Sequence, residues 1–269
     1  MQGIKLSSAK QPIPAITLKK GEALMLRTCK ADGTSSVSRL VNGWVVYSIP
    51  FQWPKKGKVS CDDWNPKPIC GGGLHGLLWG AGVAANLSGE ADAAWLVVRI
   101  KTSDAVVVGI GKVKVPSGNV VYFGDRDTAV ALIQKHAPAG TDVVYRTATA
   151  GDRGKATAGN WGTATAGYGG KATAGDRGTA TAGDRGKATA GTGGKATAGD
   201  RGTATAGNWG TATAGNWGTA TAGYGGTLVF HYLIGRKYQT ATFEVGKDNI
   251  ELNVKYRVTE KGKPYKVTE

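Results

Sequence analysis

The sequence is poor in cysteine and lacks a long apolar run. Only Cys29, Cys61 and Cys70 occur in 269 residues. Because this number is odd and no secretory apolar segment begins the chain, we expect a reducing compartment and no disulfide framework. No apolar run is long enough to cross a bilayer, so we expect no membrane contact and a cytoplasmic location.

A dense block of basic residues is also missing. The net charge is +15, of which residues 147–226 carry +4, so the basic character is spread over the whole chain. This charge permits contact with nucleic acid or another anionic surface. It is equally typical of an ordinary soluble basic protein.

Residues 147–226 form a tandem array of ten octapeptides with no insertion or deletion. Each copy reads [Thr/Lys]-Ala-Thr-Ala-Gly-x-x-Gly, and a fixed short period indicates one small unit stacked on itself. The copies begin at Thr147, Lys155, Thr163, Lys171, Thr179, Lys187, Lys195, Thr203, Thr211 and Thr219.

The octapeptide predicts a short strand followed by a turn. Its first four residues alternate with a period of two, and lysine occurs only at the first position. Since a buried row of lysines is too costly, the first and third positions face solvent and the alanines face inward. Asp and Asn at the variable positions favour turns, and the flanking glycines permit positive φ.

Such a unit builds a β-solenoid with two or three octapeptides per coil. Lysine recurs every sixteen residues at 155, 171 and 187, which favours two. Five coils stacked at about 4.8 Å would then be about 24 Å tall. Residues 227–234 continue the strand pattern but replace inward alanine by Leu228 and Phe230, which indicates a cap.

The chain is predicted to be β-rich. We expect a polar tail (1–21), an α+β N-terminal domain (22–140), an octapeptide-repeat β-solenoid (141–226) and an antiparallel β cap (227–269). In the N-terminal domain a helix capped by Asp125 or Asp127 should end at His136. A short helix is expected near 82–87 and a buried strand at 105–108. Segments 238–245 and 253–259 should pair into the small sheet of the cap.

Two features together resemble a group of uncharacterised bacterial and phage-borne proteins. One is the N-terminal series Phe51-Gln-Trp-Pro, Cys70-Gly-Gly-Gly-Leu-His-Gly, Trp95-Leu-Val-Val and Gly124-Asp. The other is the octapeptide array with its closing Tyr238-Gln-Thr-Ala and Asn253-Val-Lys-Tyr-Arg-Val. The resemblance covers nearly the whole chain and implies phage association in a bacterium or phage-infected cell. It implies no activity.

Cys70 and His75 are the best candidates for catalysis or ligand binding in the N-terminal domain. A histidine can activate a thiolate, and the three glycines between them let backbone N–H groups approach a substrate. No orienting third residue can be named, and a structural cysteine beside a hydrogen-bonded histidine is commoner. We therefore lean against an enzyme.

Neither a metal nor a cofactor is expected. Cys61, Cys70 and His75 are spaced unlike the common zinc patterns, and Asp62, Asp63 or a distant histidine would have to complete the set. The glycine pair at 109–111 lacks the spacing of a phosphate-binding loop.

The repeat surface offers three further functions. Its Thr-x-Thr rows resemble the hydroxyl arrays of ice-binding solenoids, although lysine interrupts both faces. Turn arginines and tryptophans could grip nucleic acid, but Asp precedes each arginine and neutralises it locally. A rigid rod with variable turns is also a good surface for binding a protein.

We interpret the chain as a non-enzymatic interaction protein that binds a macromolecular partner through the solenoid. A protein is favoured over nucleic acid, and self-association is possible through a flat threonine face. The alternatives are a Cys70/His75 enzyme or ligand-binding domain, an ice-binding solenoid and a nucleic-acid binder. The residues predicted to bind a partner are Arg153, Trp161, Arg177, Arg185, Arg201, Trp209, Trp217, Lys155, Lys171 and Lys187.

Overall fold

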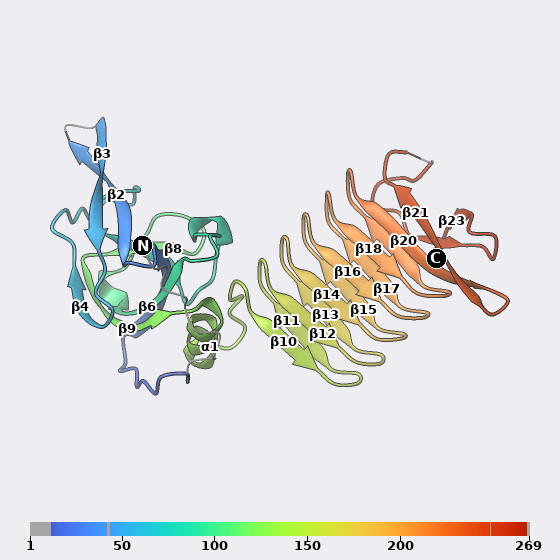
Figure 1. The fold of residues 1–269 in the computed structure, drawn as a ribbon, viewed down its shortest axis with the longest axis horizontal. Coiled ribbons are helices and arrows are strands. Elements are labelled where there is room, and N and C mark those ends of the chain that lie inside the picture. Colours follow the sequence, from blue (N-terminus) through green and yellow to red (C-terminus); the bar gives the residue numbers. More distant parts are fainter. Residues whose placement is uncertain (1–11, 42–43, 248, 268–269) are drawn as a thin grey trace, which may run out of the picture. The chain divides into compact units, whose positions relative to one another are not determined.

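The computed structural model describes residues 12–41, 44–247 and 249–267. The chain divides into two units, Met1–Val143 and Val144–Glu269. Figure 1 shows the ribbon coloured along the sequence. The β-rich fold class predicted from the sequence is confirmed, with an α+β N-terminal unit followed by a β-solenoid.

The N-terminal unit is built on a seven-stranded antiparallel sheet with the order β4-β9-β6-β1-β5-β8-β7. Strands β6 and β1, next to each other in the middle of this order, are apolar and almost wholly buried, and they give the unit its core. A separate hairpin is formed by β2 (Thr34–Val41) and β3 (Trp44–Gln52). The sheet strands are β1 (Glu22–Cys29), β4 (Gly57–Ser60), β5 (Leu74–Leu78), β6 (Ala94–Lys101), β7 (Val106–Val107), β8 (Lys112–Val115) and β9 (Ser117–Gly124).

One helix, α1 (Arg126–His136), packs against β1, β6 and β9. It begins where the Asp125 carboxylate accepts a hydrogen bond of 2.8 Å from the Thr128 backbone N–H, which satisfies one free donor of the first turn. Ala129, Val130, Leu132 and Ile133 are buried on one face. The predicted cap and end of this helix are confirmed.

One of two local expectations in this unit is confirmed and the other is wrong. The short helix expected near 82–87 is present as a 3₁₀ turn, Ala84–Asn86. The strand expected to be buried at 105–108 is the two-residue β7, and Val107 is 64% exposed. An edge strand pairs on one side only, so apolar composition alone did not reveal its exposure.

Each octapeptide of the second unit forms one four-residue strand and one turn. The first nine strands each pair in parallel with the strand sixteen residues later, as Thr147 with Thr163 and Lys155 with Lys171. Two octapeptides therefore make one coil, as the lysine spacing favoured. The strands are β10 (Thr147–Ala150), β11 (Lys155–Ala158), β12 (Thr163–Ala166), β13 (Lys171–Ala174), β14 (Thr179–Ala182), β15 (Lys187–Ala190), β16 (Lys195–Ala198), β17 (Thr203–Ala206), β18 (Thr211–Ala214) and β19 (Thr219–Ala222).

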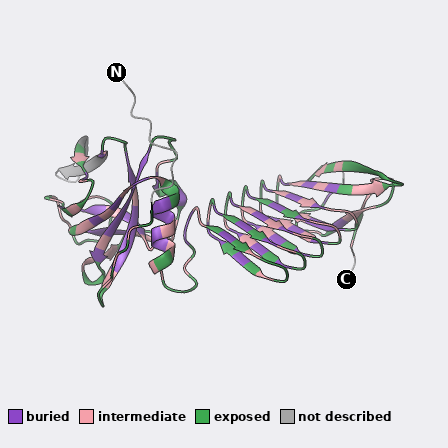
Figure 2. Cartoon of the chain, turned by 60° about the horizontal axis from the view of Figure 1, so that its bottom comes forward, coloured by how far each residue is buried: buried purple, intermediate pink, exposed green. Residues whose placement is uncertain are grey.

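The solenoid core consists almost entirely of alanine. Both alanines of nearly every strand are buried, and the threonines and lysines between them are mostly exposed or partly exposed. Figure 2 shows this alternation along the strands. Because a methyl group is the largest side chain that repeats inside, each coil buries little apolar area, and stability depends on repetition.

Nearly all flanking glycines of the turns are required by close packing, and none of them has a positive φ, which corrects the expectation. A Cβ added at Gly199 would collide with the Asp184 carboxylate of the preceding coil, and one at Gly202 would lie 2.8 Å from the Ala198 Cβ. The left-handed residue is instead the second variable one, as in Arg153 (φ 54°) and Trp161 (φ 60°). This conformation lets its N–H bond the next coil, as from Arg153 to the Tyr168 carbonyl at 2.7 Å.

The first variable residue of the turn links neighbouring coils. A side-chain oxygen of Asp or Asn accepts a hydrogen bond of 2.8–2.9 Å from the backbone N–H sixteen residues later. A backbone donor at the edge is thereby satisfied by the coil before it. The acceptors are Asp152, Asn160, Asp176, Asp184, Asp200 and Asn208.

The cap begins as predicted, because Leu228 and Phe230 of β20 (Thr227–Ile234) replace inward alanines and are buried. The small sheet expected from 238–245 and 253–259 is wrong. Strand β21 (Lys237–Glu244) extends one solenoid sheet by pairing with β20. Strands β22 (Tyr256–Val258) and β23 (Pro264–Lys266) extend the other sheet from β19.

We expect Asp200→Ala to destabilise the solenoid by about 1 kcal/mol, because it removes the acceptor for the Asn216 N–H. Thr192→Ala at the equivalent turn position is the matched control and should cost less. Urea unfolding followed by circular dichroism measures both. Equal effects of the two substitutions would contradict a stabilising role for the carboxylate.

Candidate functional site

The outward residues of β10, β12, β14, β16 and β18 form a nearly uniform surface, here called the threonine face. Parallel in-register pairing places equivalent side chains of successive coils in straight rows. Nine of the ten outward residues are threonine, and Lys195 is the exception. They are Thr147, Thr149, Thr163, Thr165, Thr179, Thr181, Lys195, Thr197, Thr211 and Thr213.

The opposite sheet has a different surface, here called the lysine face, made by the outward residues of β11, β13, β15, β17 and β19. Lys155, Lys171 and Lys187 pair in register on three successive strands and are all exposed. At the far end Thr219 is buried, and its hydroxyl accepts a hydrogen bond of 3.0 Å from Arg257. The two faces therefore differ in charge although they share one repeat.

The turn residues predicted to bind a partner are exposed and lie along two edges. Arg153, Arg185, Arg201 and Trp217 lie on one edge, while Trp161, Arg177 and Trp209 lie on the other.

Several of these turn side chains stack on the neighbouring coil. The Arg177 guanidinium lies 5.1 Å from the Trp161 ring, and Trp209 meets Tyr224 edge-on at 5.2 Å. Their contacts thus contribute to coil stacking. A binding role for them stays a prediction.

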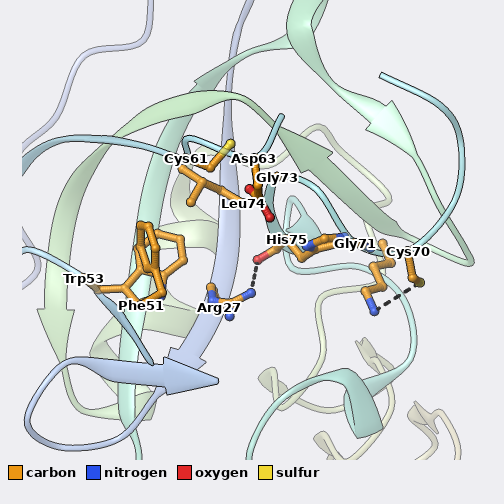
Figure 3. Close-up of a pocket in the computed structure, with 11 residues that line it drawn as sticks. Arg27, Phe51, Trp53, Cys61, Asp63, Cys70, Gly71, Gly73, Leu74 and His75 are labelled. Carbon is orange, nitrogen blue, oxygen red and sulfur yellow. Dashed lines mark hydrogen bonds between the residues drawn. The ribbon is translucent and has the colours of Figure 1, made fainter. Parts of the chain in front are cut away.

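In the N-terminal unit, Cys70 and His75 line one cavity of about 260 Å³. Figure 3 shows His75 between Arg27 on one side and Cys70 on the other. Cys70 is exposed, and its Sγ accepts from Lys112 Nζ at 3.8 Å. Because the thiol is exposed, a reagent can reach it. A buried Cys70 would have argued against catalysis at this site.

The imidazole of His75 is engaged by the backbone of the glycine loop. Its Nε2 accepts a hydrogen bond of 3.3 Å from the Gly71 N–H, and Gly73 also bonds the ring. Burial, with further effects from Lys112 and Arg27, lowers the His75 pKa to about 4. The neutral ring is therefore held as an acceptor for the loop, which does not favour it as a base for Cys70.

No three histidine, cysteine, aspartate or glutamate side chains gather into a metal-binding cluster within the described residues. The zinc set of Cys61, Cys70, His75 and an aspartate therefore has no geometric support there. Within the same residues no helix has the length and hydropathy needed to cross a bilayer.

Sequence reasoning missed two cations beside the cavity, Arg27 and Lys114. Arg27 interrupts the apolar run of β1, which is the signal that could have identified it. Lys114 is 0% exposed, and its ammonium donates to the Ile69 and Gly71 carbonyls at 2.8 and 2.9 Å. Lys114 alternates with two valines in β8, and the loop that it binds covers it.

Comparison with known proteins finds ice nucleation proteins. The chain is 38% identical over 87 residues to one from Xanthomonas campestris pv. translucens, covering 32% of this chain and 6% of that protein. It is 37% identical over 129 residues to one from Pseudomonas syringae, covering 47% and 10%. Ice nucleation protein InaU of Pantoea ananas is 30% identical over 120 residues, covering 44% and 10%.

This chain spans a tenth or less of the length of these relatives. No family model and no solved structure matches it. The similarity supports a C-terminal repeat solenoid. It gives no support to phage origin or to a family defined by the Cys-x-x-Gly-Leu-His element.

The similarity overturns two expectations. The main function predicted from the sequence, binding of a macromolecular partner through the solenoid surface, is wrong, and the ice-binding alternative is the better supported. The sequence analysis counted lysine on either face against ice binding, although the threonine face has one lysine and the lysine face has three. The cytoplasmic location expected from the sequence is also contradicted by the similarity to ice nucleation proteins.

We expect the N-terminal unit to lose stability as the pH falls from about 6.5 to about 4. The lowered pKa of His75 means that the unfolded chain binds the proton first in this window, so stability is present above it and lost below it. The loss should be about 2 kcal/mol after allowance for solvent screening of this partly buried ring. NMR titration of the His75 ring should give a midpoint near 4, and His75→Gln should flatten the pH dependence of urea unfolding. A midpoint near 6.5 would contradict the burial effect.

Proposed function

We propose that the solenoid binds ice, or water ordered as in ice, through the threonine face. The observation that carries this proposal is the in-register stacking of Thr-x-Thr on one sheet. The first residues of β10, β12 and β14 are threonines that pair directly. The third residues of the same strands, Thr149, Thr165 and Thr181, do so as well. The names of the relatives support the same function.

The geometry of a parallel sheet makes these hydroxyl groups a two-dimensional lattice. Neighbouring strands are about 4.8 Å apart, and outward residues along one strand are about 6.6 Å apart. Threonine is stiff at χ1 because it is β-branched, so the lattice of hydroxyl and methyl groups is held in place. Water bound to an ordered lattice loses less entropy on freezing than water bound to mobile groups.

The lysine face is poorly suited to the same role. Lys155, Lys171 and Lys187 occupy three successive positions of its first row. Each ammonium is strongly hydrated and moves on a flexible four-carbon stem, so it does not hold water in a lattice. The proposal is therefore one-sided.

The array is short, since each solenoid sheet presents five repeat strands. The stretch that matches is about a tenth of the length of these relatives, and a longer array would order more water. We therefore expect this chain alone to bind an existing ice surface, and to nucleate ice only at lower temperatures than a long array.

Replacing Thr165 and Thr181 by lysine should abolish ice binding, because both side chains lie in the row formed by the third strand residues of the threonine face. Thr173→Lys with Thr189→Lys is the matched control, at the same strand position on the lysine face. Thermal hysteresis and droplet freezing of the full chain measure the effect, and circular dichroism checks folding. Equal losses in both pairs, or no activity in the unmodified chain, would overturn the proposal.

Lys195→Thr should increase the activity, because it completes the first row of the threonine face between Thr179 and Thr211. Lys171→Thr is the control, since its row remains interrupted by Lys155 and Lys187. Both substitutions remove one positive charge. An equal gain from the two would show that net charge, and not the row, governs the activity.

A further inference from the structure

The cavity beside His75 has the size and lining of a small-molecule site in the N-terminal unit. Its volume of about 260 Å³ lies near the lower end of ligand pockets. Arg27 of β1, His75 of β5 and Lys112 of β8 line it together with the glycine loop. Figure 3 shows Arg27 with Phe51 and Trp53 on one side and Cys70 with Gly71 on the other.

Arg27 is a cation with neutral contacts. One terminal nitrogen donates to the His75 carbonyl at 2.7 Å, and the other donates to the Ser35 hydroxyl at 3.2 Å. Among the described residues no carboxylate forms an ion pair with it. A guanidinium has five N–H donors, so these two bonds leave others for a ligand. Burial lowers the Arg27 pKa to about 10, as expected of a charge without an anionic partner.

Cations outnumber carboxylates around the cavity. Lys112, Arg27 and Lys114 all add to the lowering of the His75 pKa, which burial chiefly causes. Asp63 is the one carboxylate among the lining residues. Its charge raises the pKa of Cys61 and of Lys114, and the three nearby cations outnumber it.

Apolar surface lies next to this positive end. Phe51 and Trp53 meet edge-on at 5.2 Å, and the Arg27 guanidinium lies 4.9 Å from the Trp53 ring. Leu74 adds an aliphatic side chain to the lining. A ligand that fits both surfaces has an acidic group and an apolar body.

We propose that this cavity binds a small organic anion, with its carboxylate or phosphate at Arg27 and Lys112 and its apolar part against Phe51 and Trp53. The site is one of binding and not of catalysis, because the backbone engages the His75 ring. It is separate from the threonine face, so either function can fail without the other.

The test uses the full chain and isothermal titration with phenyl phosphate, benzoate and inorganic phosphate. Phenyl phosphate or benzoate should bind saturably and more tightly than inorganic phosphate. Lys112→Met should weaken that binding about tenfold, by loss of one charge-assisted bond. Lys135→Met, on the exposed side of α1, is the control and should bind normally. Arg27 is left unchanged because it also holds β5 and Ser35.

Alkylation of Cys70 locates the ligand. This exposed thiol lines the cavity, so bound phenyl phosphate should slow its reaction with iodoacetamide, measured by mass spectrometry. Protection of Cys70 in the unmodified chain and its loss in Lys112→Met would support the site. No saturable binding of either aromatic anion, equal affinity in Lys112→Met and Lys135→Met, or binding without protection of Cys70 would overturn it. Inorganic phosphate binding as tightly as phenyl phosphate would overturn the apolar half of the site.

Discussion

Contact between each residue of the solenoid and the residue sixteen positions later is the constraint on which the second unit depends. Coils stacked at the spacing of a β-sheet bring identical positions together, so any side chain must tolerate a copy of itself. Alanine meets this condition inside, and glycine meets it where turns press on one another, as at Gly199. Threonine meets it outside, where rows of hydroxyl groups remain in water.

The same contact explains why the turns vary without disturbing the coil. The first variable residue links coils through a side-chain oxygen, and the second adopts φ near 55° to turn its N–H toward the next coil. The second link joins backbone atoms only, so Arg, Trp or Gly can occupy that position, while the first link needs Asp or Asn. Chemical variety is confined to the edges, and the two faces keep their order.

The N-terminal unit follows a different principle. Its sheet joins strands distant in sequence, and its core is made of large apolar side chains. Cations interrupt that core at Arg27 and Lys114, and each donates to backbone carbonyls or neutral groups instead of a carboxylate. Such residues cost stability unless they serve the loop and the cavity that they line. The unit thus contains a cavity lined by charged residues, for which the alanine core of the repetitive unit has no room.

The sequence by itself determined the solenoid, because a strict eight-residue period leaves few choices. Strand, turn, outward threonine and the widened cap at Leu228 and Phe230 all follow from alternation and from the cost of burying lysine. The helix after Asp125 followed from local capping in the same way. Tertiary structure decided what depends on distant partners. Pairing between strands far apart in the chain gathered Arg27, His75 and Lys112 around one cavity, and no local pattern records that pairing. Stacking of coils likewise decided why the turn glycines are needed and which sheets β21 and β22 extend, since both depend on contacts that exist only after folding.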